Sequence, residues 1–530
     1  MQRTRNCSIG LTSTLAATGL VLLAGFAFVQ VGQDGDSPNQ AIAAEPAKAD
    51  APGRLPPVPK LFDGWSTPDT VLVLTGQQGG YLEPCGCTEN QSGGMARRAD
   101  LFHQLWGRGW RTVGIDVGGS LNKDRLFTEQ ALLKLDFFRK ALQHMHYAGV
   151  GLGVEELRLG GEKLFEIYSM WSSEDGFDLK FLSANVTILS SKDLGIPIEY
   201  QIVESGGLRI GITSVIGKSK AKELPKVDPS ILKIDDPMVA LPAVLAKMKA
   251  KSPDLYVLMA HADDDECEQL AKTFPDFKVI VTAGGPEDPE SRERRVGETL
   301  LVHTGRKGKY AACVGVFGPK TRLTTKLEMI ELTRQRFETA PEMTELMRIY
   351  QEQIRTQRPD TAFERKLDRD AAFVGVDECK ACHKKAYDVW IKSAHSHALE
   401  SLTTGRADEK PEEVVDRQFD PECLACHVTG WDPQRAERFA SGFVDLKTSP
   451  KLAGQQCENC HGPGSRHVKL ELAFAKSKQA SVELETARDE LRETRSCTDC
   501  HDHDNSPKFE YDAYWNGTGG SAPVVHEGKD

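Results

Sequence analysis

The chain has 530 residues, of which 39% are hydrophobic and 27% are charged, and its formal net charge is −11. This length predicts two or more domains, and the composition favours globular domains over a membrane bundle. The negative charge argues against nucleic acid as a partner, because phosphate binding needs a basic face. Eight of the 13 cysteines lie between Cys379 and Cys500, which is not the pattern of an even disulfide framework.

Residues 1–32 have the layout of an export signal. Arg3 and Arg5 precede an apolar stretch from about Ile9 to Val31, as in a signal peptide or a signal anchor. The stretch approaches the roughly 20 residues that span a bilayer, so both cleavage and membrane anchoring stay open. We expect a periplasmic protein, either released or anchored with its domains facing the periplasm. Residues 33–67 are rich in Asp, Ala and Pro and are expected to form a flexible linker.

Residues 68–333 predict an α/β domain. Continuously apolar runs at 71–74, 255–259 and 279–281 alternate with stretches whose apolar residues recur at the helical period. Strands that are apolar on both sides indicate sheets covered on both faces, flanked by helices. Residues 334–370 are expected to contain a helix that links this domain to the next.

Three segments of this domain are specific enough to compare with a family. They are YLEPCGC at 81–87, GGMARRA at 93–99 and SANV at 183–186. On these segments the domain resembles the calcineurin-like metallophosphoesterase fold of the bacterial 5′-nucleotidase type. Cys85 and Cys87 stand one residue apart, which is unfavourable for a mutual disulfide. They could bind a soft metal, pair with other cysteines or be structural.

The resemblance implies a site for two metal ions, but most matching positions hold residues that are not ligands. These positions are Gln77, Gly79, Gly119, Val154, Glu155, Gly285 and Glu287, and only His261 is kept. One imidazole cannot hold two metals, and without them no hydroxide nucleophile forms at neutral pH. We therefore expect a fold without the family's hydrolase activity. His261 is better explained as a satisfied polar group than as a working ligand, although with the acidic run 263–266 it could bind a stray cation.

Four copies of Cys-x-x-Cys-His occur in residues 371–530. Two thiols three positions apart on a helical turn reach the two vinyl groups of one haem, and the following His is aimed at the iron. Two zinc sites built from the cysteine pairs would not explain a His after every pair. We therefore predict four covalently attached haem c groups. The attachment residues are Cys379, Cys382, Cys423, Cys426, Cys457, Cys460, Cys497 and Cys500, and the proximal iron ligands are His383, His427, His461 and His501.

This C-terminal segment has few long apolar runs and many Gly, Pro and polar residues. Such a segment would struggle to build a core from side chains alone, and stacked porphyrins would supply the missing apolar mass. We predict a mainly α, loop-rich multihaem domain over residues 371–530.

Further segments lie at fixed places around the four motifs. They are WIKSAH at 390–395, VTG at 428–430, HGPGSRH at 461–467, and SPKF at 506–509 followed by Tyr514-Trp515. They resemble the tetrahaem cytochrome family typified by the electron acceptor of hydroxylamine oxidoreductase in ammonia-oxidising bacteria. The resemblance covers about residues 374–529 and implies His395, His467 and His526 as distal iron ligands. The Gly/Ser-rich stretch 516–521, which precedes His526, departs from the family pattern. The other two histidines of this region, His397 and His503, are expected to face solvent.

Three distal ligands for four haems leave the sixth coordination position of one iron unassigned. We expect electron transfer between redox protein partners, because an iron ligated by two His residues has no room for substrate. The alternative is an oxidoreductase acting on a small nitrogen or sulfur compound at an open haem. Because no Cys-x-x-Cys-Lys motif occurs, the carrier is favoured over the enzyme. A second alternative is a 5′-nucleotidase-like metallophosphoesterase fused to a cytochrome. In the favoured interpretation, the degenerate α/β domain is a docking or binding module.

Overall fold

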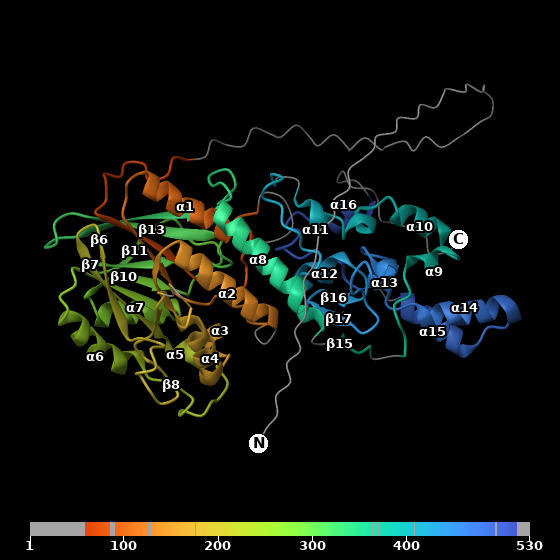
Figure 1. Ribbon diagram of the computed structural model, residues 1–530, viewed down its shortest axis with the longest axis horizontal. Helices are drawn as coiled ribbons and strands as arrows, with labels where there is room; N and C mark the ends of the chain where they lie inside the picture. Colours follow the sequence, from red (N-terminus) through yellow and green to blue (C-terminus); the bar gives the residue numbers. More distant parts are fainter. Residues whose placement is uncertain are drawn as a thin grey trace, which may run out of the picture. The chain divides into compact units, whose positions relative to one another are not determined.

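A computed structural model gives the structure of residues 59–84, 91–125, 129–174, 176, 178–361, 364–367, 370–406, 409–492 and 495–516 (Figure 1). The expected export signal, most of the linker, Cys85, Cys87 and the expected ligand His526 lie outside these residues. Among the residues described, no helix combines the length and apolar character needed to cross a membrane.

The first of two six-stranded sheets has the order β14-β13-β1-β2-β3-β4. Strands β1 to β4 are parallel, and β13 and β14 extend the sheet in antiparallel fashion. The bounds are β1 Thr70–Thr75, β2 Thr112–Asp116, β3 Tyr147–Gly151, β4 Phe181–Leu182, β13 Tyr310–Phe317 and β14 Thr324–Glu331.

The second sheet has the order β11-β12-β10-β9-β7-β6, with parallel pairing from β12 to β7 and antiparallel strands at both edges. The bounds are β6 Tyr200–Ser205, β7 Leu208–Ile216, β9 Leu255–His261, β10 Phe277–Thr282, β11 Arg294–Val296 and β12 Thr299–His303. A separate two-stranded sheet pairs β5 (Val186–Ile188) with β8 (Leu232–Ile234).

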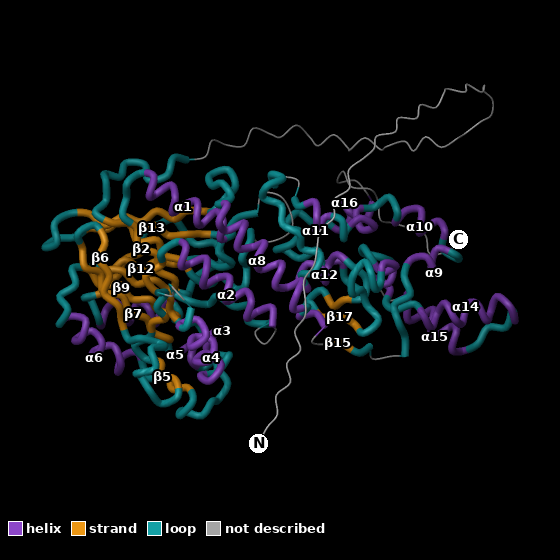
Figure 2. Tube along the Cα trace, viewed as in Figure 1, coloured by secondary structure: helices purple, strands orange, loops and turns teal. Residues whose placement is uncertain are grey.

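The two sheets pack face to face, with helices on their outer faces (Figure 2). Strand β1 shows why, because its side chains alternate: Val71 and Val73 contact the helices, while Leu72 and Leu74 pack among strands of both sheets. This confirms the predicted α/β class with strands buried on both sides. The first sheet is covered by α1 Met95–Gly107, α2 Glu129–His144, α4 Gly161–Ser172 and α8 Pro341–Gln357, and the second by α6 Pro237–Lys249 and α7 Asp264–Thr273. Helices α3 (Val154–Leu157) and α5 (Lys218–Ala221) are single turns between strands.

The α/β domain begins earlier than its composition indicates. Phe62, expected in the flexible linker, is buried and its backbone N–H donates to the Glu328 carboxylate at 2.7 and 2.9 Å. Trp65 stacks on Trp110 with ring centroids 6.1 Å apart. The linker prediction was therefore wrong for these residues, since two aromatic side chains bury against the domain despite their polar, Pro-rich surroundings.

The C-terminal part consists of short helices, long loops and one small sheet (Figure 1). The sheet, which the sequence pattern did not predict, joins β15 Glu364–Arg365, β17 Glu437–Phe439 and β16 Trp431–Asp432. The α-helices are α9 Val376–Lys380, α10 Lys384–Trp390, α11 Ser401–Thr404, α12 Pro421–His427, α13 Cys457–His461, α14 Ser465–Ser477, α15 Val482–Arg492 and α16 Tyr511–Asn516. The 3-10 turns are η1 Pro359–Thr361, η2 Ala394–His397, η3 Pro450–Leu452 and η4 Cys497–Asp499.

Candidate haem-binding sites

Each Cys-x-x-Cys-His motif lies on or directly after a short helical turn. The first begins in α9, the second ends α12, the third forms α13 and the fourth begins in η4. Local capping fixes these turns: Asp420 accepts a hydrogen bond from Glu422 N at 3.0 Å before α12, and Ser496 accepts from Thr498 N at 3.2 Å before η4. A helical turn places residues i and i+3 on one side, so both thiols of a motif face the same way.

Two proximal histidines have a second histidine ring opposite them. The ring centroids of His383 and His467 are 6.4 Å apart, and those of His395 and His501 are 6.0 Å apart. Metal–imidazole bonds of about 2 Å on both sides of one iron would place two ring centroids roughly 6 Å apart. The structure therefore brings His467 to the first motif and His395 to the fourth.

The proximal rings are oriented through their Nδ1 atoms. Nδ1 of His427 lies 2.7 Å from the Ala398 carbonyl oxygen, and Nδ1 of His461 lies 2.7 Å from the Leu491 carbonyl oxygen. A carbonyl only accepts, so in both rings Nδ1 carries the proton and Nε2 keeps its lone pair. Metal-ligating histidines are commonly held in this way. These two residues therefore fit an iron at Nε2.

Burial keeps four of the predicted ligands in the neutral form that binds metals. Desolvation lowers the pKa of His395, His427, His467 and His501 below the usual histidine value. For His395 the nearby His501 lowers the pKa further. Since ligation requires an unprotonated ring nitrogen, this electrostatic setting favours iron binding at neutral pH.

The four motifs are neighbours in space. Cys379 of the first motif lies close enough to Cys457 of the third for the two thiols to shift each other's pKa, and Cys426 of the second motif lowers the pKa of Cys500 of the fourth. Cys460 lies close enough to Cys497 and Cys500 to interact electrostatically with both. The first and third motifs thus form one pair, the second and fourth another, and the pairs adjoin.

The side-chain core of this region is small. It centres on Leu424, Trp431, Phe439 and Phe443, and α10, α14 and α16 contain no buried residue. This agrees with a segment whose apolar mass comes largely from porphyrin. The two thiols of each motif lie on one side of a helical turn, and the buried imidazoles favour the neutral form. These residues fit haem c. When bound, haem c supplies an iron that exchanges single electrons.

The position expected for phosphoesterase metals is occupied by internal hydrogen bonds. The buried Glu156 carboxylate accepts from Gly119 N at 3.1 Å, Ser120 N at 2.7 Å and Gly153 N at 2.7 Å. His261 Nε2 accepts from Val154 N at 3.4 Å, and burial lowers the pKa of His261 to about 4. In the part of the chain that the structure describes, no group of three or more His, Cys, Asp or Glu side chains is placed to hold a metal ion.

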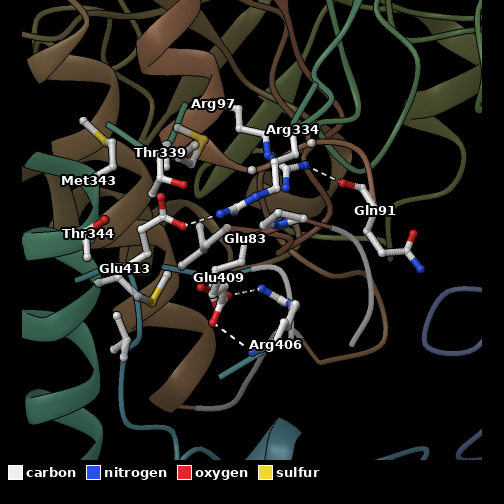
Figure 3. A pocket seen from close by; sticks show the side chains of 18 of the residues that line it. Glu83, Gln91, Arg97, Arg334, Thr339, Met343, Thr344, Arg406, Glu409 and Glu413 are labelled. Carbon is white, nitrogen blue, oxygen red and sulfur yellow. Dashed lines mark hydrogen bonds and ion pairs between the residues drawn. The ribbon is translucent and has the colours of Figure 1, made fainter. Parts of the chain in front are cut away.

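A cavity of about 60 Å³ lies between the residues before α1, helix α8 and the residues Arg406, Glu409, Glu413 and Val415 (Figure 3). Its charged wall is made of ion pairs that sequence reasoning missed. Arg334 contacts Glu413 at 2.8 Å, Arg406 contacts Glu409 at 2.7 Å, and Arg417 contacts Glu83. Two of these pairs join residues of the α/β domain to residues of the C-terminal part, and nothing in their local sequence marks them.

Residues 378–462 match the family described as cytochrome c554 and c-prime. Over 153 residues the chain is 31% identical to cytochrome c-554 of Nitrosomonas europaea, a match that covers 27% of this chain and 63% of that protein. The chain thus spans less than two thirds of that relative's length.

Solved structures similar to the chain include a nucleotidase, a thiohydrolase and a phosphoesterase. A 5′-nucleotidase precursor from Thermus thermophilus has a TM-score of 0.46 and 23% identity, covering 54% of this chain and 59% of that one. The sulfate thiohydrolase SoxB of the same organism has a TM-score of 0.46 and 14% identity, with 62% and 68% covered. The calcineurin-like phosphoesterase YfkN from Bacillus subtilis has a TM-score of 0.41 and 13% identity, with 53% and 96% covered. The chain is therefore similar to cytochrome c-554 in its C-terminal part, the resemblance that its haem motifs indicate.

Proposed function

We propose that the chain is an exported electron-transfer protein with four haem c groups in residues 371–530. One observation carries the proposal: the ring pairs His383–His467 and His395–His501, with centroids 6.4 and 6.0 Å apart. An iron with imidazole on both sides exchanges electrons and offers no position to a substrate. The match to the cytochrome c554 family supports the haem chemistry.

The ring geometry supports two of the proposed distal ligands, and the sequence resemblance supports the third. His467 is the distal ligand of the first haem and His395 that of the fourth. His526, outside the described residues, is the proposed distal ligand of the second or third. The proposed partners are redox proteins, and the proposed location is the periplasm, supported by the signal-like N-terminus and by the attachment of haem c outside the cytoplasm in bacteria.

One observation favours a second candidate function. Three distal ligands for four irons leave one iron free to bind a small nitrogen or sulfur compound. The chain would then be an oxidoreductase in which the two His-paired haems carry electrons to or from the open one.

The test uses the full chain, produced in a host that attaches haem c. We expect four haems per chain by the pyridine haemochrome assay. Carbon monoxide added to the reduced protein should change the Soret band of one haem at most. A chain without covalent haem would refute the cytochrome assignment, and carbon monoxide binding at every haem would refute electron transfer through His-paired irons. One responsive haem would direct substrate trials to that iron.

A further inference from the structure

The fourth motif is followed by a tight turn that contains Asp504, three residues after the proposed ligand His501. The Asp502 carboxylate accepts from Asn505 N at 2.7 Å, and Ser506 N donates to the Asp502 carbonyl at 2.8 Å. The Ser506 hydroxyl in turn lies 2.9 Å from His501 Nδ1. Asp504 is therefore held at a fixed place close to the proximal ligand.

Three residues of the α/β domain bind this aspartate. The Tyr81 hydroxyl donates to one carboxylate oxygen at 2.8 Å, and Lys307 Nζ donates to the other at 2.6 Å. The Gln91 side-chain amide donates to the Asp504 carbonyl at 3.3 Å. The Lys307 and Asp504 side chains are only 22% and 20% exposed, so their attraction is screened less than that of a surface pair.

This contact lies beyond the carboxyl ends of strands β1 and β12, which belong to the two different sheets. Tyr81 follows β1, Lys307 follows β12, and Lys307 N donates to the Gln77 carbonyl at 2.8 Å. Gln77 is one of the positions matched to a metal ligand of the metallophosphoesterase family. This part of the α/β domain is thus in contact with the chain's own C-terminal part.

A second contact reaches the fourth motif from its other side. The Gln434 side chain donates to the Asp499 carbonyl at 2.7 Å, inside the motif. The Gln434 carbonyl accepts from Arg125 of the α/β domain at 2.9 Å. The α/β domain therefore contacts the turn after His501 directly and reaches Asp499, before His501, through Gln434.

We propose that this part of the α/β domain serves to hold the fourth haem motif, and that Lys307 tunes the reduction potential of that haem by compensating the charge of Asp504. The inference rests on the proposed function, because it requires haem at Cys497 and Cys500. Without the lysine, an uncompensated carboxylate near the haem favours the ferric state, which carries one more positive charge. Lys307 also pairs with Glu287 at 3.0 Å, so without the aspartate it is the loss of a negative charge near the haem that favours the ferrous state.

Potentiometric titration of the full, haem-loaded chain, followed by visible spectra, tests the proposal. Lys307→Gln should lower the midpoint of one haem, and Asp504→Asn should raise the midpoint of one haem. Each change is expected to alter the ratio of reduced to oxidised haem about tenfold at a fixed potential, which for one electron is about 59 mV. Lys307→Arg, which keeps the charge, should behave like the unchanged chain.

The matched control is Lys320→Gln, which removes a lysine that is paired with Asp254 at 2.9 Å in another part of the α/β domain. It should move no midpoint. Loss of a contact with only a structural role would not shift the potential in opposite directions for Lys307→Gln and Asp504→Asn. Shifts of the same sign, or no shift in both variants with four haems attached, would overturn the proposal. Absence of haem mass from the peptide containing Cys497 and Cys500 would instead overturn the haem assignment itself.

Discussion

The side-chain amide of Gln130 on α2 donates to the Asp420 carboxylate at 2.7 Å, and Asp420 is the residue that caps α12. Gln351 of α8 donates to the other carboxylate oxygen at 2.9 Å. Asp420 is buried, and that burial is the main cause that raises its pKa. Two helices of the α/β domain thus hold the start of the helix that carries the second haem motif.

Replacing Asp420 by Ala should destabilise the folded chain. The cap itself contributes about 1 kcal/mol, and the buried amides of Gln130 and Gln351 lose their acceptor at a cost of roughly 1–3 kcal/mol. Urea unfolding followed by tryptophan fluorescence measures the change. Asp416→Ala, which removes an exposed carboxylate bound to Gln418 N at 2.9 Å, is the control. Equal stability of the two variants would contradict the anchoring role.

His467→Ala should open one haem to carbon monoxide. The proposed distal imidazole of the first haem is removed, while Cys379, Cys382 and His383 keep the haem attached. The reduced variant is expected to have one more carbon-monoxide-sensitive haem than the unchanged chain, at the same haem content. His397→Ala is the control, because His397 is exposed and contacts Glu400 at 3.3 Å. An unchanged carbon monoxide response in the His467 variant would refute its ligand role.

The Glu83–Arg417 pair should make stability depend on acid pH. Burial alone would raise the pKa of Glu83, but the Arg417 guanidinium beside it brings the pKa down from 4.5 to about 2. Because the folded pKa lies below the unfolded one, the stabilisation is complete above pH 4.5 and is lost as pH falls toward 2.

Glu83→Gln should therefore lower the free energy of unfolding at about pH 6. Between about pH 5 and pH 3, the free energy of unfolding of this variant should decrease less than that of the unchanged chain. Urea titrations at these three pH values measure both effects. Glu338→Gln, which removes an exposed partner of Lys410, should leave the pH profile unchanged. A Glu83 variant whose stability falls as steeply as that of the unchanged chain would exclude the pair as an acid-sensitive element.

Two neighbouring carboxyl groups should respond differently to neutralisation. Glu156→Gln replaces an acceptor that binds the backbone N–H groups of Gly119, Ser120 and Gly153, so it should cost about 1–3 kcal/mol. Glu155→Gln should raise the stability at pH 7, because burial and the charge of Glu156 raise the pKa of Glu155 to about 7, so that the carboxyl group, ionised in the unfolded chain, costs stability in the folded one. Thermal unfolding of both variants measures the difference. A larger loss in the Glu155 variant would contradict this assignment.

The predicted haem attachment rests on the sequence alone, because its chemistry requires residues that are close together in the chain. The cysteine and proximal histidine positions therefore follow from spacing alone. The pairing of His467 with His383 and of His395 with His501 depends on how distant loops fold together, and spacing does not contain that information.

Strands could be predicted where apolar residues continue over several positions, as in β1. Short strands could not be predicted. Strands β15 and β16 have two residues each, which is too short for a periodic signal. The residues Asp420 and Asp504 were also missed, since their partners Gln130 and Lys307 lie far away in the sequence. A lone aspartate next to a loop does not reveal such a partner.

The contacts of Asp420 and Asp504 also bear on how the chain can be divided. A fragment that began at residue 371 would retain all four attachment motifs, yet it would lose the groups that bind these two aspartates. In such a fragment, the helix of the second motif would lack its hydrogen bonds from Gln130 and Gln351. The turn after the fourth motif would carry the Asp504 carboxylate without its partner Lys307. Composition indicates a domain boundary near residue 370, but the side-chain contacts of Asp420 and Asp504 cross it. Spectra and potentials measured on the isolated fragment would therefore differ from those of the intact chain.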